Sequence, residues 1–186
     1  MKRIFDLIFV FFIIIFLCIP IVLIALSIKL TSKGNVIYWS NRVGIKNKIF
    51  KMPKFRSMNI EAPEIASHLM DNPDDYLIPV GKFLRRNSLD ELPQLFSILK
   101  GDMTFVGPRP ALYNQYDLID LRHNSGINEL IPGVTGWAQV NGRDKISIIE
   151  KVRLDEEYLN KKSFLFDVKI IWLTLIRIIK KKDISH

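Results

Sequence analysis

Two adjacent carboxylates, Asp90 and Glu91, are the side chains of this sequence best placed for chemistry. Apolar residues recur at helical spacing just after them and predict an amphipathic helix over residues 94–100 that ends at Gly101. Pro93 fits only the first turn of a helix, so the helix should begin near Asp90 or the residue before it. Both carboxylates should therefore lie at a helix N-terminus.

A helix N-terminus presents free backbone N–H groups and the positive end of the helix dipole. It would keep Asp90 ionised and would also attract phosphate groups. Neighbouring residues on a helix point about 100° apart, so Asp90 and Glu91 cannot act as one symmetric pair, and any catalytic roles must differ. A structural interpretation stays open, because Ser88 followed three residues later by Glu91 also matches a helix capping box.

One arginine, Arg109, sits in the proline-rich stretch 107–110 (GPRP). Pro110 favours an extended backbone at Arg109, and Pro108 stiffens the segment before it. A rigid loop that carries one guanidinium suits two-point contact with phosphate oxygens. The alternative is a solvated arginine in a proline turn, and the acidic helix start upstream favours phosphate binding over it.

A glycine-rich stretch at residues 131–144 is a weaker candidate for ligand contact, because its glycines are also typical of ordinary turns. Pro132-Gly133 predicts a type II turn, and Asn141-Gly142 predicts a second tight turn. The polar side chains that such turns would bring close to a ligand are Gln139, Asn141 and Arg143.

The elements that must position these residues begin with an apolar segment, Ile4–Ile28, long enough to cross a bilayer as a straight helix. It is too long for a cleavable signal peptide and lacks a small-residue cleavage site. A spanning anchor is one interpretation. Basic residues flank both ends, however, and Pro20 should kink the helix. Both features favour a re-entrant helix that dips into the membrane and returns to the same face.

The rest of the chain predicts a small mixed domain. Val36–Trp39 and Ile49–Met52 have the composition of two short strands around a turn, which predicts a β-hairpin. Residues 61–75 are acidic and loosely helical. The C-terminal segment from residue 163 predicts an amphipathic helix in the membrane interface, with its polar residues near one face. These polar residues are Asp167, Thr174, Arg177 and Lys181.

The overall charge is basic: Lys and Arg outnumber Asp and Glu by 27 to 19, which gives a formal net charge of +8. Such a surplus suits an anionic membrane surface, phosphorylated substrates or nucleic acid. Neither a basic–aromatic pattern nor a helix-turn-helix context accompanies it, so nucleic acid binding is disfavoured. The single cysteine, Cys18, rules out an intrachain disulfide, and the histidines have no metal-ligand spacing.

In their order along the chain, these segments resemble the monotopic phosphoglycosyl transferases, the bacterial sugar transferase family that initiates surface glycan assembly. The resemblance covers almost the whole chain and is closest to the small members, which carry the catalytic core alone. Two positions depart from the family pattern: Ile19 stands where a serine often precedes the kink proline, and Ile131 where a basic residue often precedes Pro-Gly. The matching segments are KRIFD (2–6), KFRSM (54–58), SLDELPQLFSILKGDM (88–103), FVGPRP (105–110), PGVTGWAQVNGR (132–143), LDEEYL (154–159) and SFLFDVKIIWLT (163–174).

The resemblance implies a two-step transfer of a sugar-1-phosphate from a UDP-sugar to polyprenyl phosphate, with undecaprenyl phosphate as the expected acceptor. Asp90 would be the nucleophile that forms a phospho-sugar–aspartyl intermediate and releases UMP. Glu91 would assist, and Asp90 would also bind Mg²⁺. Lys54 and Arg109 would bind phosphate. Gln139, Asn141 and Arg143 would line the nucleotide side.

The implied fold is α+β and mainly helical, with a small β-hairpin. Residues 1–33 would form a re-entrant membrane helix, 34–162 a catalytic domain and 163–186 an interfacial amphipathic helix. The protein would be monotopic, on the cytoplasmic face of the bacterial inner membrane, in contact with anionic lipid. The sequence contains no code for the sugar or the glycan pathway and leaves the oligomeric state open, a homodimer included.

Two other functions stay open at this point. One is a glycosyltransferase or hydrolase on a spanning anchor, in which Asp90 and Glu91 act as acid and base. The other is a non-catalytic membrane scaffold that uses its basic face to hold anionic lipid. Release of UMP from a UDP-sugar separates the transferase from the first, and loss of turnover in Asp90→Asn excludes the second.

Overall fold

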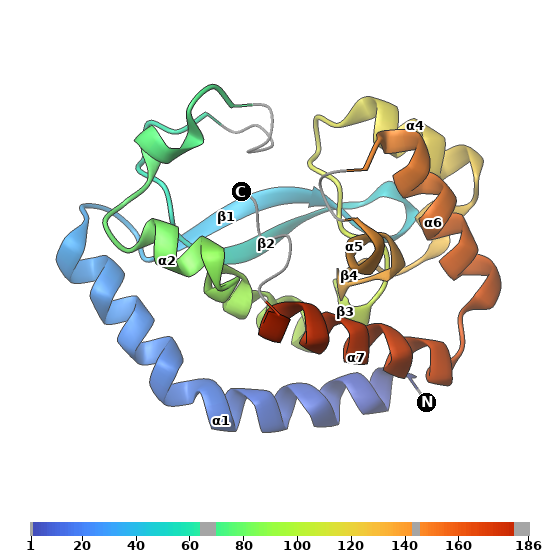
Figure 1. The fold of residues 1–186 in the computed structure, drawn as a ribbon, viewed down its shortest axis with the longest axis horizontal. Helices are drawn as coiled ribbons and strands as arrows, with labels where there is room; N and C mark the ends of the chain where they lie inside the picture. Colours follow the sequence, from blue (N-terminus) through green and yellow to red (C-terminus); the bar gives the residue numbers. More distant parts are fainter. Residues whose placement is uncertain (1, 64–69, 143–145, 181–186) are drawn as a thin grey trace.

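The computed structural model describes residues 2–63, 70–142 and 146–180, and it confirms an α+β fold made mainly of helices (Figure 1). Short 3-10 turns, among them η3 (Pro73–Tyr76) and η4 (Leu89–Gln94), join the main elements. The helices and strands are α1 (Lys2–Thr31), β1 (Ile37–Val43), β2 (Ile49–Phe55), α2 (Gly81–Arg86), α3 (Leu95–Lys100), β3 (Thr104–Val106), α4 (Tyr116–Asn124), β4 (Gly133–Thr135), α5 (Trp137–Asn141), α6 (Ile148–Lys161) and α7 (Phe164–Lys180).

The predicted hairpin is confirmed. Strands β1 and β2 pair antiparallel, with Tyr38 opposite Lys54 and Ser40 opposite Met52. Because directly opposed residues project from the same face of a sheet, Lys54 shares a face with the buried residues Ser40 and Met52. Within the acidic stretch that was expected to be loosely helical, residues 64–69 lie outside the described part of the chain, and η3 covers its end.

A second, parallel pair, β3 and β4, corrects the prediction of a turn at Pro132-Gly133, because Gly133 begins β4. Here glycine serves close backbone approach rather than turn formation. A Cβ atom on Gly133 would lie 2.1 Å from the backbone nitrogen of Gly107. The Gly107 N–H donates to the Thr135 carbonyl at 2.9 Å, and the Gly133 N–H donates to the Pro108 carbonyl at 2.9 Å. The stretch that carries Arg109 is thus fastened to β4.

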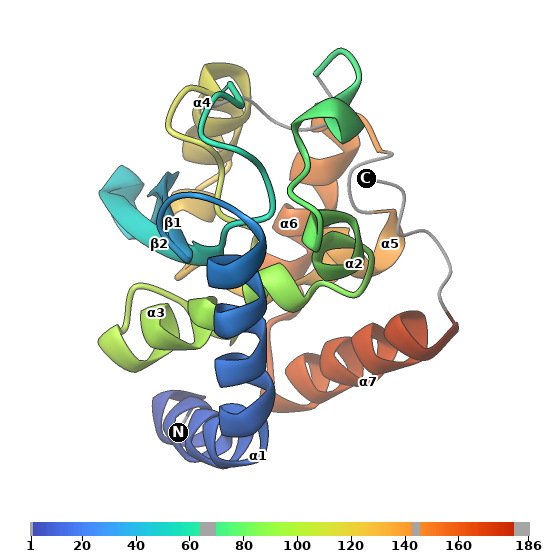
Figure 2. The same cartoon turned by 90° about the vertical axis from the view of Figure 1, so that its left-hand side faces the viewer.

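Helix α1 is continuous but bent, and it contains Pro20, which cannot donate a backbone hydrogen bond (Figures 1 and 2). Its first turns bind the body of the protein. Lys2 Nζ donates to the Val106 carbonyl and to Asp167, each at 2.7 Å. Asp6, which is buried, accepts a hydrogen bond of 2.6 Å from Thr104 Oγ1.

The C-terminal end of α1 binds the same body. Arg56 follows β2 directly, and its buried guanidinium donates to the Lys33 carbonyl at 2.5 Å and to the Asn35 carbonyl at 2.6 Å. It also donates to Ser32 Oγ at 2.9 Å. Ile28, in the last turns of α1, is fully buried. Both ends of this apolar helix are therefore anchored to one domain.

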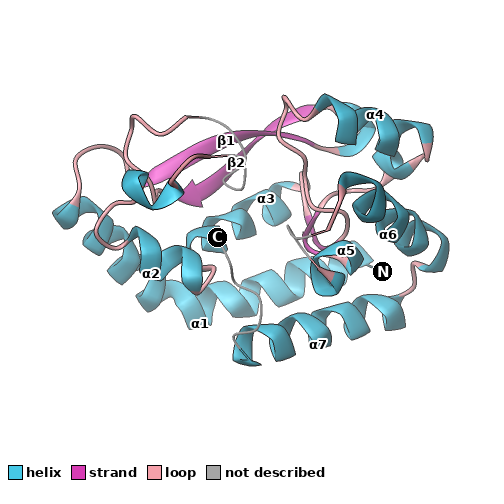
Figure 3. Ribbon diagram, turned by 45° about the horizontal axis from the view of Figure 1, so that its top comes forward, coloured by secondary structure: helices cyan, strands magenta, loops and turns pink. Residues whose placement is uncertain are grey.

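Helices α1 and α7 lie together along one side of the molecule (Figures 1 and 3). In the described part of the chain, α1 is the helix long and apolar enough to cross a membrane, and its apolar window is only 6% buried. On α7, Asp167 and Thr174 face inward, to Tyr158 and Thr135 respectively. Its exposed large side chains are Phe164, Leu165, Val168, Trp172, Leu175 and Ile178. The amphipathic prediction for α7 is confirmed, with Lys181 outside the described residues.

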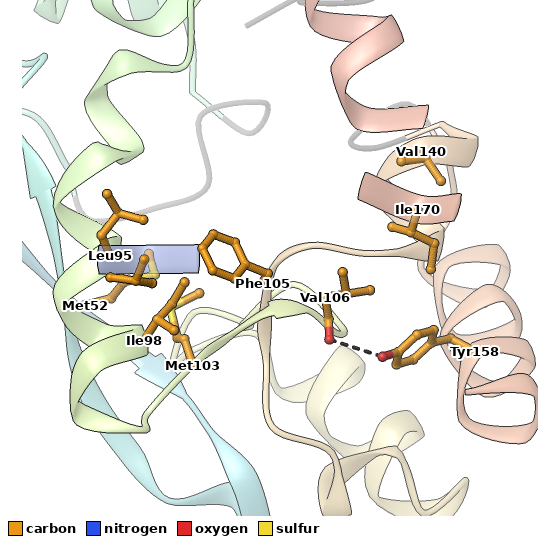
Figure 4. Close-up of a cluster of buried hydrophobic side chains, with 10 residues drawn as sticks. Met52, Leu95, Ile98, Met103, Phe105, Val106, Val140, Tyr158 and Ile170 are labelled. Carbon is orange, nitrogen blue, oxygen red and sulfur yellow. Dashed lines mark hydrogen bonds between the residues drawn. The ribbon is translucent and has the colours of Figure 1, made fainter. Parts of the chain in front are cut away.

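The main core joins the two halves of the domain (Figure 4). Met52, Leu95 and Ile98 pack on one side of Phe105, and Val106 and Tyr158 lie on the other side of it. The buried Tyr158 hydroxyl group donates a hydrogen bond to Asp167 at 2.7 Å, and its oxygen lies 3.1 Å from the Val106 carbonyl oxygen. The β3 segment before the arginine loop is therefore fixed by packing and by hydrogen bonds.

The contact between Gly107 and Gly133 makes a stability prediction. Gly133→Ala should lower the free energy of unfolding by about 3 kcal/mol, because the new methyl group meets backbone atoms that cannot rotate away. Gly126→Ala is the control: its Cβ atom would meet nothing within 4 Å, and its left-handed backbone costs about 1 kcal/mol. Thermal unfolding in detergent micelles measures both. Equal midpoints for the two variants would contradict the tight approach.

Candidate active site

Asp90 lies in the first turn of η4, and its carboxyl group is largely buried. The helix start predicted beside it is confirmed, since η4 runs directly into α3, which ends at Gly101 in the left-handed conformation. Asp90 Oδ2 is 3.9 Å from Lys54 Nζ, an ion-pair distance beyond hydrogen-bond length. Burial raises the pKa of Asp90 above its usual value, and the charge of Lys54 opposes that rise.

Glu91 is bound by two cations that are distant in sequence. Its Oε1 accepts hydrogen bonds from Lys54 Nζ at 3.1 Å and from Arg109 Nη2 at 2.8 Å. The capping-box interpretation is wrong: Ser88 is in the left-handed conformation (φ 54°) and its side chain makes no cap hydrogen bond. The Glu91 side chain therefore belongs to a charge network instead of capping a helix.

Lys54 comes from the end of β2, and its side chain is only 15% exposed. Burial lowers the pKa of Lys54, while the carboxylates of Glu91 and Asp90 act against that change. The hairpin therefore supplies a desolvated ammonium group that bridges both acidic side chains. The sequence placed Lys54 in a phosphate site only through a family motif, and the structure brings it to the two carboxylates.

Arg109 extends from the proline-rich loop after β3 to Glu91, and its side chain is 26% exposed. Two arginine side chains from other elements bind backbone carbonyl groups of this loop. Arg122 on α4 donates to the Arg109 carbonyl at 2.8 Å, and Arg42 on β1 donates to the Pro110 carbonyl at 3.2 Å. The expected rigid arginine loop is thus present and aimed at the acidic residues.

Two further cations lie close to this cluster, and sequence reasoning missed both. Arg85, buried in α2, acts electrostatically on Asp90, and its guanidinium contacts Met58 Sδ at 3.3 Å. The positive charge of Arg42 lowers the pKa of Lys54. The signal available for Arg85 was its position five residues before Asp90, but nothing in the sequence separates it from Arg86 beside it, which is exposed.

The candidates for the nucleotide side are placed on or after α5. Gln139 Nε2 donates to the Val134 carbonyl at 3.5 Å, and Gln139 Oε1 is buried and has no hydrogen-bond partner within the part of the chain that the structure describes. Asn141 Nδ2 donates to the Trp137 carbonyl at 2.7 Å, which ties its amide to its own helix. Gly142 follows the helix at its C-terminal end, where a turn was expected. Arg143 lies outside the described residues.

Asp90 and Glu91 are the acidic side chains of this site that could hold a magnesium ion. Within residues 2–63, 70–142 and 146–180, no group of three or more His, Cys, Asp or Glu side chains could hold a metal. Mg²⁺ commonly uses one or two carboxylates and takes its other ligands from phosphates and water. Asp90, whose carboxyl group is 3.9 Å from Lys54 Nζ, fits that role better than Glu91, whose Oε1 accepts hydrogen bonds from Lys54 and Arg109.

The site therefore holds two largely buried acidic side chains beside two cations from separate parts of the chain, Lys54 of β2 and Arg109 of the loop after β3. A carboxylate next to ammonium and guanidinium groups can attack a phosphorus atom while the cations bind the phosphate oxygens. Residues 1–181 match the family model described as bacterial sugar transferase.

Individual relatives carry related names. UDP-glucose:undecaprenyl-phosphate glucose-1-phosphate transferase of Escherichia coli (strain K12) is 44% identical over 83% of the chain, and the match covers 35% of that protein. The undecaprenyl-phosphate glucose phosphotransferase of Komagataeibacter xylinus is 37% identical over 95% of the chain and 35% of its own length. A Bacillus subtilis (strain 168) protein named uncharacterized sugar transferase EpsL is 37% identical over 100% of the chain and 91% of its own length.

The chain thus spans about a third of the length of the first two relatives and most of the third. The matched region includes the acidic helix start, the arginine loop and the apolar N-terminal helix. On this match, over nearly its whole length, the chain belongs to the bacterial sugar transferase family.

Proposed function

We propose that this protein transfers a sugar-1-phosphate from a UDP-sugar to a polyprenyl phosphate, with undecaprenyl phosphate as acceptor, and so initiates the assembly of a surface glycan. The observation that carries the proposal is the geometry around Glu91, whose carboxylate joins Lys54 at 3.1 Å and Arg109 at 2.8 Å directly beside the buried Asp90. The names of the relatives from Escherichia coli and Komagataeibacter xylinus support the substrate classes.

Asp90 is the proposed nucleophile. Its carboxylate oxygen attacks the β-phosphorus of the UDP-sugar, the bond from that phosphorus to the bridging oxygen breaks, and UMP leaves with the bond's electron pair. The phosphate oxygen of the polyprenyl acceptor then attacks the same phosphorus and releases Asp90. Burial favours this role, because a desolvated carboxylate is a stronger nucleophile than one surrounded by water.

The neighbouring cations bind the phosphate oxygens on which negative charge develops. Arg109 offers a planar pair of donors and Lys54 a compact positive charge. Before substrate binds, Glu91 holds both cations in place. We assign Glu91 the role of an orienting or acid–base group. We assign contacts with the nucleotide to Gln139, Asn141 and Arg143.

A bound Mg²⁺, held by Asp90 and by phosphate oxygens, would neutralise phosphate charge and align the diphosphate. The carboxylate chemistry of the site supports this choice of ion. Lys54 and Arg109 would bind the same negatively charged phosphate groups. The side chains of this protein would therefore bind and orient the phosphates.

The site lies beside the membrane helix. Leu89 and Leu92, which flank the acidic pair in η4, pack in one apolar cluster with Ile21, Ile24 and Ile28 of α1. An acceptor with an apolar tail and a phosphate head can therefore present its head to Asp90 while its tail stays near the hydrocarbon region. This contact supports a membrane-bound acceptor over a soluble one.

We further propose a monotopic topology on the cytoplasmic face of the bacterial inner membrane. Lys2 and Arg56 fix the two ends of α1 to one domain, and a helix that spans the bilayer would have to separate them. The bend of α1, a helix that contains Pro20, lets the helix dip into the membrane and return. The outward apolar face of α7 would then lie in the interface, with the net positive charge favouring anionic lipid.

The covalent intermediate is tested by mass spectrometry. Reconstituted protein, incubated with Mg²⁺ and a panel of UDP-sugars without acceptor, should release UMP and carry a phospho-sugar on the peptide that contains Asp90. Asp90→Asn should reduce turnover by at least about 10⁴-fold and abolish the adduct, because the nucleophile is missing. UMP that appears only after polyprenyl phosphate is added, with no adduct at any time, contradicts the two-step mechanism.

The pH dependence of kcat/KM follows from the two perturbed groups. Asp90 must be ionised to attack, and because its pKa is raised, activity should fall with decreasing pH at a value above 3.8. Lys54 must be protonated, and because its pKa is lowered, activity should fall with increasing pH at a value below 10.5. Lys54→Arg should shift only the alkaline limb upward, since guanidinium stays charged. If the alkaline limb does not shift in Lys54→Arg, the protonation of Lys54 does not control activity.

The topology is tested by labelling spheroplasts with an impermeant thiol reagent in a Cys18→Ala background. A cysteine added before Met1 should be as protected as Glu156→Cys, an exposed position on α6. Pro20→Leu should restore the missing N–H, straighten the segment and expose a fraction of the N-terminal cysteines. Strong labelling of the N-terminal cysteine in the parent, with Glu156→Cys protected, would mean that α1 spans the membrane.

A further inference from the structure

The loop that carries Arg109 is held by its backbone carbonyl groups. The Arg109 carbonyl accepts from Arg122 Nη1 at 2.8 Å, and the next carbonyl, that of Pro110, accepts from Arg42 Nη1 at 3.2 Å. Hydrogen bonds from charged donors are stronger than those between neutral groups. Two guanidinium groups on two different elements, α4 and β1, therefore fix consecutive peptide groups at the residue whose side chain reaches Glu91.

Arg122 is in turn fixed by Asp155 on α6. Its Nη2 and Nε lie 2.6 and 3.1 Å from Asp155 Oδ2. The side chains of Arg122 and Asp155 are 9% and 0% exposed. Two nitrogens of one guanidinium bind the carboxylate and the third binds the Arg109 carbonyl, so the three groups form one continuous chain of contacts.

Burial of this ion pair is costly. Burial raises the pKa of Asp155 despite the nearby Arg122, and its second oxygen, Oδ1, is buried and has no hydrogen-bond partner among the described residues. A buried ion pair of this kind often contributes little to stability compared with apolar residues of the same size. Its contact with the Arg109 carbonyl gives it a role that apolar residues could not fill.

The loop that carries Arg109 is held by packing as well as by polar contacts. Pro108 and Pro110, on both sides of Arg109, are buried. A small hollow lined by both prolines and Arg122, among other residues, lies against the loop. The hydrogen bonds to the loop carbonyl groups add directional contacts that apolar packing does not provide.

We propose that Arg122 and Asp155 are a positioning pair for the reaction: Asp155 orients Arg122, and Arg122 holds the Arg109 backbone so that the Arg109 side chain meets the transferred phosphate. The proposal rests on the proposed function of Arg109 as a phosphate-binding residue. Neither Arg122 nor Asp155 touches the acidic pair in the contacts described above, and both act through the loop.

The first experiment measures the loop without any turnover. Arg122→Lys keeps a positive charge beside Asp155 but cannot bind the carboxylate twice and the carbonyl group at once. Hydrogen–deuterium exchange of the full-length protein in nanodiscs should become about tenfold or more faster in the peptide that covers residues 105–112, because a charged hydrogen bond is lost. Arg153→Lys, an exposed position on α6 that pairs with Glu150, is the matched control and should leave that peptide unchanged.

The second experiment separates positioning from general stability. UMP release is measured for the parent, Arg122→Lys, Arg109→Lys and the double variant, each normalised to folded protein. Arg122→Lys should lower kcat/KM by about ten- to a hundredfold in the parent background. In the Arg109→Lys background it should have little further effect, because the group that it positions has already been replaced.

The outcomes are distinct. Unchanged exchange in residues 105–112, or the same loss from Arg122→Lys with and without Arg109, overturns the positioning role. Exchange that rises there, together with a loss of activity that depends on Arg109, supports it. If the parent protein releases no UMP from any UDP-sugar, the proposed function fails, and the exchange measurement still decides whether Arg122 holds the loop.

Discussion

The burial of two adjacent acidic side chains is the constraint on which the site depends. A carboxylate removed from water is costly unless cations or hydrogen-bond donors surround it. Asp90 and Glu91 have few such partners in their own short helical segment, so the compensation comes from elsewhere: Lys54 from the hairpin and Arg109 from the loop after β3. The positions of β2 and of this loop therefore depend on the attraction between these two cations and the acidic side chains of η4.

The same constraint extends outward through the fold. Arg109 can serve Glu91 only if its loop has one conformation, and that conformation depends on contacts with three other parts of the chain. Gly107 and Gly133 bring the β3 and β4 segments into backbone contact, while Arg122 and Arg42 hold the loop carbonyls. Elements with no acidic or basic role at the site, such as β4, thus contribute to its geometry.

The sequence predicted best what local rules determine. The helix start beside Asp90, the left-handed end at Gly101 and the hairpin all depend on residues close together in the chain, and all are confirmed. The capping-box interpretation was wrong because it considers only contacts between Glu91 and residues close to it in the chain. In the folded protein, two cations 37 and 18 residues away bind Glu91 more favourably than a backbone N–H group would.

Other features depended on contacts that no local pattern encodes. The prediction of a turn at Pro132-Gly133 was wrong. Glycine is required at position 133 because its backbone approaches Gly107 closely, and not because the chain turns there. Arg85 could not be told from Arg86 by sequence, since only the packing of α2 decides which of the two is buried. The family motif did identify Lys54, but its link to Glu91 is a tertiary contact.

The orientation of α7 indicates what kind of medium surrounds this side of the protein. In water, an amphipathic helix buries its apolar face and exposes its polar one. Here Asp167 and Thr174 point inward to Tyr158 and Thr135, and Trp172 and Leu165 point outward. Such an arrangement is favourable only where the outer medium is itself apolar.

Helix α1 presents the same kind of surface, and both of its ends are bound to the domain by Lys2 and Arg56. Leu89 and Leu92, which flank the acidic pair, pack in one apolar cluster with Ile28 of this helix. A reaction between a water-soluble nucleotide sugar and a lipid-linked phosphate requires a site that both solvents can reach. Under the proposed function, the position of η4 directly on the apolar helix α1 would meet that requirement, and neither substrate would have to move far from its own medium.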